Sequence, residues 1–431
     1  MTTKQVKQKT KMVCVYNHGG SIMSPFPNNL AEAIEWLSSY GTVPGGGVTR
    51  TLYSKPWKEA QQAQKEWMEE LGLQTSYDPI GNLFGRLASE DSMAPTILVG
   101  SHIDTVLSGG KYDGAYGILA GILALKHLKK HHGHPKVNLE VVSLCEEEGS
   151  RFPIACFGSG MMTGIYCIQD INGLSDSEGI SFEQAMKEAG FGIVEQPDVV
   201  RSDISAFVEL HIEQGPSLER LQKSIGIVQS IVGQKRFRIT VKGEPNHAGT
   251  TLMKWRKDSL LGAVTMIHDL FGLTKEYNED LVTTVGQLFV EPNVPNVIPG
   301  QVEFTVDARH PVNSVLSIFC EQFKRRFLEI AQKLGLEIGM EMWHDVQPVQ
   351  MDVKLQQMVQ TICLDSNISY HVMHSGAGHD SQLFARMCPT ALVFVPSQGG
   401  ISHSPSEYTS NHDLETGLSV LIQLLHQLAY K

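Results

Sequence analysis

The sequence has few cysteines and no long apolar run. Its seven cysteines among 431 residues are scattered and include no Cys-x-x-Cys pair, a pattern typical of reduced thiols rather than of a disulfide framework. No uninterrupted apolar segment reaches the roughly 18 residues that a membrane-spanning helix needs. The apolar stretch Met12 to Tyr16, which follows several lysines, is too short for a secretion signal. We therefore expect a soluble, cytoplasmic protein that does not bind a membrane.

Positive charge is also scarce. The chain has 35 Lys and Arg against 46 Asp and Glu, which gives a formal net charge of −11. Nucleic acids and anionic membrane surfaces bind proteins through basic footprints. Neither is an expected partner, and a small-molecule substrate fits this composition better.

Two common catalytic motifs are missing as well. There is no Gly-x-Ser-x-Gly sequence, so a nucleophilic serine hydrolase has no support. The segment Gly109-Gly110-Lys111 is not a phosphate-binding loop, because Tyr112 stands where such a loop needs Ser or Thr.

What the sequence does contain is an alternation of apolar strand-like runs and amphipathic helices. Residues 29–71 have a helical pattern interrupted by a Gly-rich loop at residues 41–47, and strands and helices then alternate up to Glu213. This order predicts an α/β domain with a mostly parallel sheet. Since 431 residues exceed what one hydrophobic core usually supports, we expect two domains.

The pattern changes after Glu219. The chain then has two hairpin-like strands, a helix, two more strands, a long helix and a last strand, at Ser224–Ile231, Lys235–Val241, Asp258–Leu273, Leu281–Val290, Gln301–Asp307, Val312–Leu334 and Leu336–Trp343. This order predicts a ferredoxin-like α+β domain, an antiparallel sheet with helices on one side. It is an insertion, because a strand of the first domain follows it. The predicted division is an N-terminal extension at 1–28, a metal-binding catalytic domain at 29–222 and 347–431, and the inserted domain at 223–346.

Four apolar runs end close to a His or a group of Glu. These pairs of run and polar residue are Thr96–Ser101 with His102, Val137–Leu144 with Glu146 to Glu148, Ile204–Leu210 with His211, and Ala391–Pro396 with His403. A fifth candidate, Asp113, lies in the Gly-rich loop after His102. Because the C-terminal ends of parallel strands line one crevice, these side chains should converge. Three His and two carboxylates suit two zinc-like cations that share a bridging ligand, so the sequence predicts a two-metal site.

The motifs suggest individual roles. The Asp104 carboxylate, two residues after His102, is placed to accept the second ring N–H and fix the tautomer. Glycines beside Asp113 let the backbone come close to a charged centre, and we assign Asp113 as the bridging carboxylate. Three adjacent Glu are costly unless cations neutralise them, so one should be a ligand and another should act as a base.

Simpler interpretations compete with these. A single His-x-Asp or Glu-Glu pair is more often part of a solvated loop, and only the joint occurrence at four strand ends is specific. The densest histidine cluster is His127, His131, His132 and His134, but it closes a helix together with lysines, where cations complement the helix dipole. It has no acidic or sulfur partner nearby, and we assign it to the surface.

The motifs together resemble the M20-type amidohydrolases, which act on carbamoyl and ureido groups. The resemblance extends from about Leu30 to the C-terminus. The motifs that carry it are Gly-Ser-His102-Ile-Asp-Thr, Asp113-Gly, Glu-Glu-Glu148-Gly-Ser-Arg-Phe, Glu-Leu-His211-Ile-Glu-Gln-Gly, Asn246-His247-Ala-Gly-Thr-Thr, Pro-Asn296-Val-Ile-Pro-Gly, Asp-Ala-Arg309-His, Ser-Gly-Ala-Gly-His379-Asp and Ile-Ser-His403-Ser-Pro. Residues 36–41, 49–54 and 231–234 are most similar to the branch of the family that hydrolyses allantoate.

The resemblance implies a role for each matching residue. Those assigned to the first metal or the bridge are His102, Asp113 and His211, and those assigned to the second metal are Glu148 and His403. Glu147 matches the general base, and His247 matches a histidine that acts in the partner subunit's site. Asp104 is counted with these catalytic residues as the partner of His102. The positions that match or adjoin substrate contacts are Gln214, Gln234, Arg236, Asn296, Arg309 and His379. The inserted domain is then a lid that also forms a homodimer.

The expected reaction is hydrolysis of the ureido group of allantoate to ureidoglycine, ammonia and carbon dioxide, a step of purine degradation. A hydroxide held between two divalent ions attacks the carbonyl carbon, and Glu147 is the general base. Zinc, manganese and cobalt all accept this ligand set. Arg309 could bind the substrate carboxylate through its planar fork, or could equally form a structural salt bridge. Two other functions remain open: an N-carbamoyl-L-amino acid hydrolase or β-ureidopropionase, and a metal-binding scaffold without activity.

Overall fold

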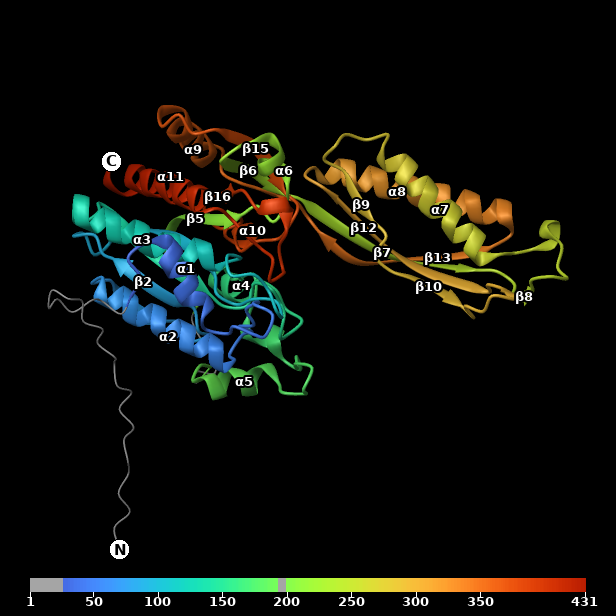
Figure 1. Cartoon of the computed structure of the whole chain (residues 1–431), viewed down its shortest axis with the longest axis horizontal. Helices are drawn as coiled ribbons and strands as arrows, with labels where there is room; N and C mark the ends of the chain where they lie inside the picture. Colours follow the sequence, from blue (N-terminus) through green and yellow to red (C-terminus); the bar gives the residue numbers. More distant parts are fainter. Residues whose placement is uncertain (1–25, 193–198) are drawn as a thin grey trace, which may run out of the picture.

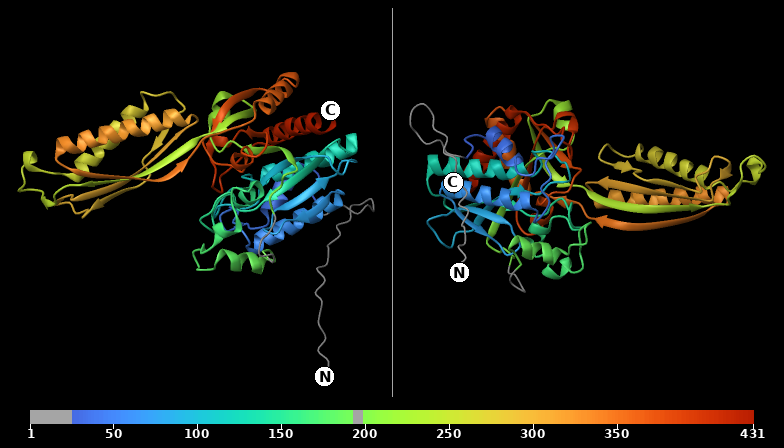
Figure 2. Two further views of the ribbon diagram at one scale, coloured as in Figure 1. Left: turned by 180° about the vertical axis from the view of Figure 1, so that it is seen from behind. Right: turned by 60° about the horizontal axis from the view of Figure 1, so that its bottom comes forward.

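The computed structural model describes residues 26–192 and 199–431. Most of the predicted N-terminal extension lies outside the described residues. The chain forms a large α/β part, which we call the body (residues 26–192, 199–232 and 347–431), and a long projection, which we call the arm (residues 233–346) (Figure 1). The two further views in Figure 2 show the arm extending away from the body, which also carries the C-terminus. No helix in the described part of the chain is long and apolar enough to cross a membrane.

The body is built on a nine-stranded mixed sheet. Its strand order is β1-β2-β4-β3-β5-β16-β6-β14, with β15 beside β6. The bounds are β1 Gln74–Tyr77, β2 Leu83–Leu87, β3 Thr96–His102, β4 Asn138–Leu144, β5 Ile204–Ile212, β6 Ile225–Ile231, β14 Val349–Gln350, β15 Tyr370–Ser375 and β16 Thr390–Val395. The central strands β4, β3, β5 and β16 are parallel to one another. They correspond to the four apolar runs of the sequence, which confirms the predicted α/β fold class.

Helices cover this sheet. Their bounds are α1 Leu30–Ser38, α2 Lys55–Glu70, α3 Ala115–His132, α4 Phe157–Thr163, α5 Phe182–Ala189, α6 Ser217–Leu221, α9 Val353–Asp365, α10 Ser381–Phe384 and α11 Asn411–Tyr430. Helix α3 packs against β3, β4 and β5 and is flanked by α1 and α11. Serine, asparagine or aspartate N-caps begin α1, α2, α9 and α11, as expected from their preference for unpaired helix N–H groups.

Two glycines of α3 determine how closely it approaches the sheet. A Cβ on Gly117 would lie 2.5 Å from the carbonyl oxygen of Leu210, and one on Gly121 would lie 2.8 Å from Val141 Cγ2. Larger residues would therefore push the helix outward. Since Asp113 lies two residues before α3, the close packing holds Asp113 beside the ends of the central strands.

The arm has its own sheet and its own core. Five antiparallel strands have the order β10-β12-β7-β13, with β9 beside β12. Their bounds are β7 Gly233–Lys242, β9 Val282–Thr284, β10 Leu288–Glu291, β12 Gln301–His310 and β13 Glu337–Val346, and the helices are α7 Ser259–Thr274 and α8 Asn313–Leu334. Both helices pack on one face through an aromatic core that includes Phe237, Phe304 and Phe323. The predicted antiparallel sheet with helices on one side is confirmed. A two-residue ribbon of β8 (Asn246–His247) and β11 (Val297–Ile298) lies at the tip (Figure 1).

Two predictions about strands were wrong. Ser224–Ile231 was expected to pair with Lys235–Val241 in the inserted domain, but β6 pairs with β14, β15 and β16 of the body. Six of its seven residues are buried, which is the pattern of an internal strand and not of a half-exposed hairpin. The run Leu281–Val290 forms two short strands, β9 and β10, instead of one. The domain limits themselves remain a prediction, because strand pairing alone does not define a domain.

Candidate metal centre

Five predicted ligands meet at the C-terminal edge of the central strands. The Nε2 atoms of His102 and His211 lie 3.5 and 3.1 Å from Asp113 Oδ1. On the other side of the same carboxylate, His403 Nε2 lies 3.3 Å from Asp113 Oδ2 and 3.5 Å from Glu148 Oε2. Two sets of three ligands, His102 with Asp113 and His211, and Asp113 with Glu148 and His403, each have their donor atoms within 4.8 Å of one another.

These distances fit two divalent cations. Donor atoms bound tetrahedrally at about 2.0–2.1 Å from one ion lie about 3.4 Å from each other, close to the spacings observed. Each Asp113 oxygen belongs to a different ligand set, which is the arrangement required of a bridging carboxylate. The donors are imidazole nitrogens and carboxylate oxygens without thiolate, a set that zinc, manganese and cobalt accept.

Backbone carbonyls fix the tautomers of the two buried histidines. His102 Nδ1 lies 3.0 Å from the carbonyl oxygen of Asp104, and His211 Nδ1 lies 2.9 Å from that of Ile212. A carbonyl oxygen can only accept, so each Nδ1 carries the proton and each Nε2 presents its lone pair to the metal centre. The N–H of Gly114 also donates to His211 Nε2 at 3.1 Å, which requires an unprotonated nitrogen there.

The predicted hydrogen bond from the His102 ring to the Asp104 carboxylate was wrong. The carboxylate is 3.8 Å from His102 Nδ1, beyond hydrogen-bond distance. It accepts the backbone N–H groups of Glu147 at 3.1 Å and Glu148 at 3.0 Å. Asp104 therefore positions the glutamates through its side chain and His102 through its backbone.

The three adjacent glutamates have different surroundings. Glu146 is fully buried, and its Oε1 accepts the N–H groups of Arg151 and Phe152, both at 3.3 Å. Glu148 faces His403, and burial together with the charge of Asp113 raises the pKa of Glu148 to about 7. Glu147 lies between them, with Oε2 3.9 Å from His102 Nε2 and Oε1 3.7 Å from the Cys156 thiol, which donates to it. Burial raises the pKa of Glu147 well above that of an exposed Glu. A carboxylate with this affinity for a proton, beside the ligands, suits a general base.

Glu407 was missed by the sequence analysis. It is buried, and its Oε1 accepts the N–H groups of Tyr112 at 3.0 Å and Asp113 at 3.1 Å. Ser402 donates to both Glu407 Oε2 at 2.8 Å and Asp113 Oδ2 at 3.1 Å. Glu407 therefore fixes the loop that presents the bridging carboxylate. Its only sequence signal is a position four residues after His403, in a turn where most acidic residues are solvated.

Two predicted substrate-binding residues lie beside the metal-binding residues. Gln214 has a positive φ of 57°, and its Nε2 donates to Asp113 Oδ2 at 2.7 Å. His379 is buried with its ring 4.6 Å from that of His211, and burial keeps its pKa well below the usual value for histidine. His379 is thus a neutral imidazole. Glu209, which begins the Glu-Leu-His211 motif but was assigned no role from the sequence, is also buried and accepts from Ser101 and Ser381. A Glu209 oxygen lies within 4.8 Å of ring nitrogens of His211 and His379.

Three predicted residues of the arm converge on Asp307, which the sequence analysis also missed. Gln234 Nε2 and Arg236 Nε donate to Asp307 Oδ2 at 2.6 and 2.9 Å. Arg309 donates to Asp307 through Nε at 3.0 Å and Nη2 at 3.1 Å, and to the Gly376 carbonyl of the body through Nη1 at 2.6 Å. Arg236, Asp307 and Arg309, but not Gln234, border a cavity of about 510 Å³ on the open face of the arm sheet. The structure therefore shows the salt bridge that was one interpretation of Arg309, in a place that a ligand can reach.

The remaining two predicted residues are far from the metal centre of their own chain. His247 is in β8 and Asn296 directly precedes β11, at the tip of the arm (Figure 1). The N–H groups of Gly249 and Thr250 donate to His247 Nδ1 at 3.0 and 3.2 Å. The ring proton must then be on Nε2, in an exposed side chain that can donate outward.

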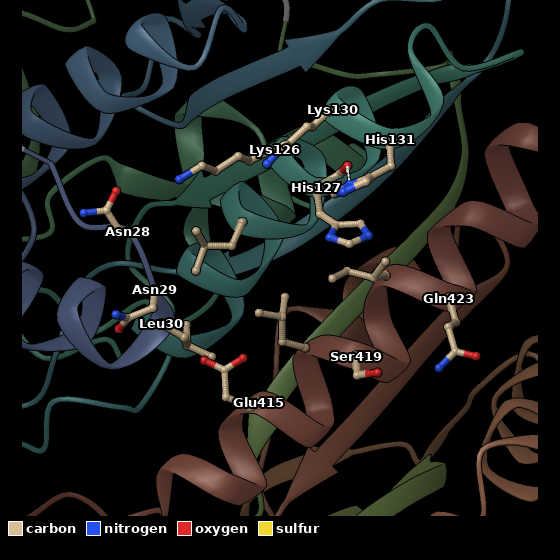
Figure 3. A pocket seen from close by; sticks show the side chains of 13 residues that line it. Asn28, Asn29, Leu30, Lys126, His127, Lys130, His131, Glu415, Ser419 and Gln423 are labelled. Carbon is tan, nitrogen blue, oxygen red and sulfur yellow. Dashed lines mark hydrogen bonds between the residues drawn. The ribbon is translucent and has the colours of Figure 1, made fainter. Parts of the chain in front are cut away.

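The histidine cluster of the sequence analysis, His127, His131, His132 and His134, lies elsewhere, at the end of α3. His127 and His131 line a groove of about 520 Å³ between α1, α3 and α11, next to Lys126 and Lys130 (Figure 3). The two rings are 4.2 Å apart, and burial lowers the pKa of His127. Within the described residues, neither joins a group of three ligand atoms close enough to share an ion.

Known proteins resemble this chain over nearly its whole length. An allantoate amidohydrolase of Bacillus subtilis is 49% identical over 403 residues, covering 94% of this chain and 98% of that protein. An allantoate amidohydrolase of Escherichia coli is 43% identical, covering 95% of this chain and 100% of that protein. The crystal structure of an amidase of the hydantoinase/carbamoylase family from Burkholderia multivorans has a TM-score of 0.89 and 34% identity, covering 93% of this chain and 97% of that one.

The family match covers both parts of the molecule. It extends over residues 98–427, which include the metal centre and the whole arm. The chain therefore belongs to peptidase family M20/M25/M40.

Proposed function

We propose that the protein hydrolyses the ureido group of allantoate to ureidoglycine, ammonia and carbon dioxide, in the degradation of purines. The observation that carries this proposal is the Asp113 carboxylate, whose two oxygens each face a separate set of ligands. Two relatives above 40% identity, both named allantoate amidohydrolase, support allantoate as the substrate.

We propose two divalent metal ions, of zinc, manganese or cobalt, as the cofactors. His102, Asp113 and His211 would hold one, and Asp113, Glu148 and His403 the other. When bound, such ions lower the pKa of a water molecule and polarise the ureido carbonyl.

Glu147 is the proposed general base. It takes a proton from the attacking water and delivers it to the leaving nitrogen. Its Oε2 faces the ligands, its Oε1 is held by the Cys156 thiol, and Asp104 fixes its backbone N–H.

The substrate carboxylate is proposed to bind Arg309. Three of the five N–H groups of this guanidinium are used on Asp307 and Gly376, which leaves two for a ligand. The remaining contacts are proposed for Gln214, Gln234, Arg236, Asn296 and His379. An acidic protein can in this way bind an anion at one local cationic site.

We propose that the arm acts as a lid and forms a homodimer. His247 lies too far from its own metal centre, and its exposed Nε2–H suits stabilisation of the developing oxyanion in the partner subunit. Large apolar side chains on the outside of α7 and α8, among them Leu261, Phe271, Ile318 and Leu328, are 40–55% exposed and offer a surface for a second copy. The six described cysteines are all free thiols, which supports a cytoplasmic location.

A second candidate is an N-carbamoyl-L-amino acid hydrolase. It would use the same metal centre, and the similarity to the Burkholderia amidase favours it. An inactive scaffold is disfavoured by Glu147, a partly buried carboxylate that belongs to neither of the two ligand sets that share Asp113.

The deciding experiment incubates metal-loaded protein with allantoate and with several N-carbamoyl-L-amino acids, and measures ammonia. We expect release from allantoate. Turnover of carbamoyl amino acids with allantoate inert would replace our assignment by the second candidate, and inertness toward both would reject both.

A further inference from the structure

Trp343 occupies an irregular position in the arm sheet. Along β13, Met342 pairs with Phe237 of β7, and the next paired residue is His344, opposite Arg236. Trp343 is the extra residue of this β-bulge. Bulges redirect a side chain while leaving the strands on either side in register, so Trp343 is added to the open face without displacing the paired residues.

The bulge places the indole against Arg236. The guanidinium carbon of Arg236 lies 5.3 Å from the centre of the Trp343 ring, and Arg236 is itself held by Asp307. Trp343 is nevertheless 48% exposed and lines the 510 Å³ cavity together with Arg309. A large aromatic ring that is fixed at one side and open at the other is a flat surface on which a planar group can stack.

This cavity is linked to the metal centre through the chain. Gly376 of the body also lines it and accepts from Arg309, and His379, three residues further on, packs against His211. A substrate bound in the cavity would therefore lie between the arm sheet and the loop that leads to the metal-binding residues.

We propose that Trp343, held in position by Arg236, binds the second ureido group of the substrate, the one that is not hydrolysed. The inference rests on allantoate being the substrate. Allantoate has a carboxylate and two ureido groups on one carbon, so three groups leave that carbon in three directions. With one ureido group at the metal centre and the carboxylate on Arg309, the second ureido group needs its own site. A ureido group is planar, so it can stack on the open face of the indole, while Arg236 against the other face holds the ring in position.

The test compares allantoate with N-carbamoylglycine, which lacks only the second ureido group. Trp343→Ala should lower kcat/KM for allantoate about tenfold, mainly through KM. It should change the constant for N-carbamoylglycine, measured as KM or as a competitive inhibition constant, by less than about twofold. Trp343→Phe keeps an aromatic face and should retain most of the preference for allantoate.

Phe289→Ala is the matched control, because Phe289 is an exposed aromatic side chain opposite Glu303 on the same sheet that does not line the cavity. It should affect neither ligand. Equal losses for both ligands in Trp343→Ala, or no loss for either, would overturn the subsite while leaving the proposed function intact. Wild-type protein that does not hydrolyse allantoate would overturn the proposed function itself.

Discussion

The metal centre and the arm hold their predicted site residues in opposite ways. His102, Asp113 and His211 are no more than 5% exposed, and hydrogen bonds that they donate to backbone carbonyls or to Glu407 fix each of them. His247 and Asn296 are exposed at the tip of the arm, at a distance from every ligand of their own chain (Figure 1). Arg309 lies between these extremes, half-buried where the arm meets the body.

This difference separates two tasks of a hydrolytic site. Groups that bind cations must keep their geometry, because burial of unpaired charge is costly and small displacements weaken the ligand set. Groups that bind the substrate and stabilise the oxyanion must let the substrate enter and the product leave. They are therefore better placed on a mobile segment or on a partner subunit. The comparison predicts that body variants alter metal binding or chemistry, whereas arm variants alter steps that need a closed or dimeric enzyme.

The largest expected effect is that of Glu147→Gln. Loss of the general base should lower kcat by about 10³-fold or more, while both ions remain bound because Glu147 is outside the two ligand sets that share Asp113. Ammonia release and metal content by atomic spectroscopy measure the two quantities. A rate that does not change would remove Glu147 as the base, and loss of metal would make it a ligand.

His247→Ala should be nearly as severe, and it tests the arm directly. Removal of one oxyanion donor costs about 10²- to 10³-fold in kcat. In a mixed dimer with Glu147→Gln, the His247→Ala subunit keeps its own Glu147 and receives His247 from its partner. Co-expression of the two inactive variants should therefore restore activity at one of the two sites of each mixed dimer, while both homodimers stay inactive.

Failure of that restoration, with mixed dimers demonstrated by two affinity tags, would place His247 in its own subunit's site. The contrast between a self-contained metal centre and a shared arm would then be lost. A monomer in sedimentation experiments would have the same consequence.

The same contrast explains what could be predicted from the sequence. Four of the five ligands were predictable because each follows an apolar run, and the ends of parallel strands converge whatever the loops do. Asp113 was predictable from its Gly-rich loop, which comes after His102. The roles of Glu407 and Asp307 were not predictable, although Asp307 begins the Asp-Ala-Arg309-His motif, because their contacts depend on how a turn and a sheet face are packed. β6 was misassigned because a short apolar run fits a strand of either sheet, and only its partners decide between them.

Glu407→Gln should have an intermediate effect, confined to the body. In the wild type, Ser402 donates to Glu407 Oε2. The Gln side chain keeps one oxygen for the N–H groups of Tyr112 and Asp113, but it presents an N–H group to Ser402 in place of the second oxygen. The orientation of Asp113 becomes looser, and metal affinity should fall about 10- to 100-fold, as for other residues that hold a ligand. Competition with a chelator measures this. Glu415→Gln, an exposed position on α11, is the matched control, and an equal loss there would show a general charge effect instead.

The smallest effect is expected for Cys156→Ala, which tests how rigidly the body holds its base. The thiol is buried and burial raises its pKa, so it stays protonated and donates to Glu147 Oε1, while Gln382 donates to the sulfur at 3.6 Å. A thiol is a weak donor, so this one hydrogen bond should contribute about 0.5–1.5 kcal/mol, and kcat should fall about two- to tenfold with KM unchanged. Cys156→Ser retains a donor and should restore most of the rate.

Cys145→Ala removes an equally buried thiol that bonds to the Ile80 carbonyl instead. A similar loss of kcat in that variant would show that both thiols act through packing, and that Glu147 needs no support from Cys156.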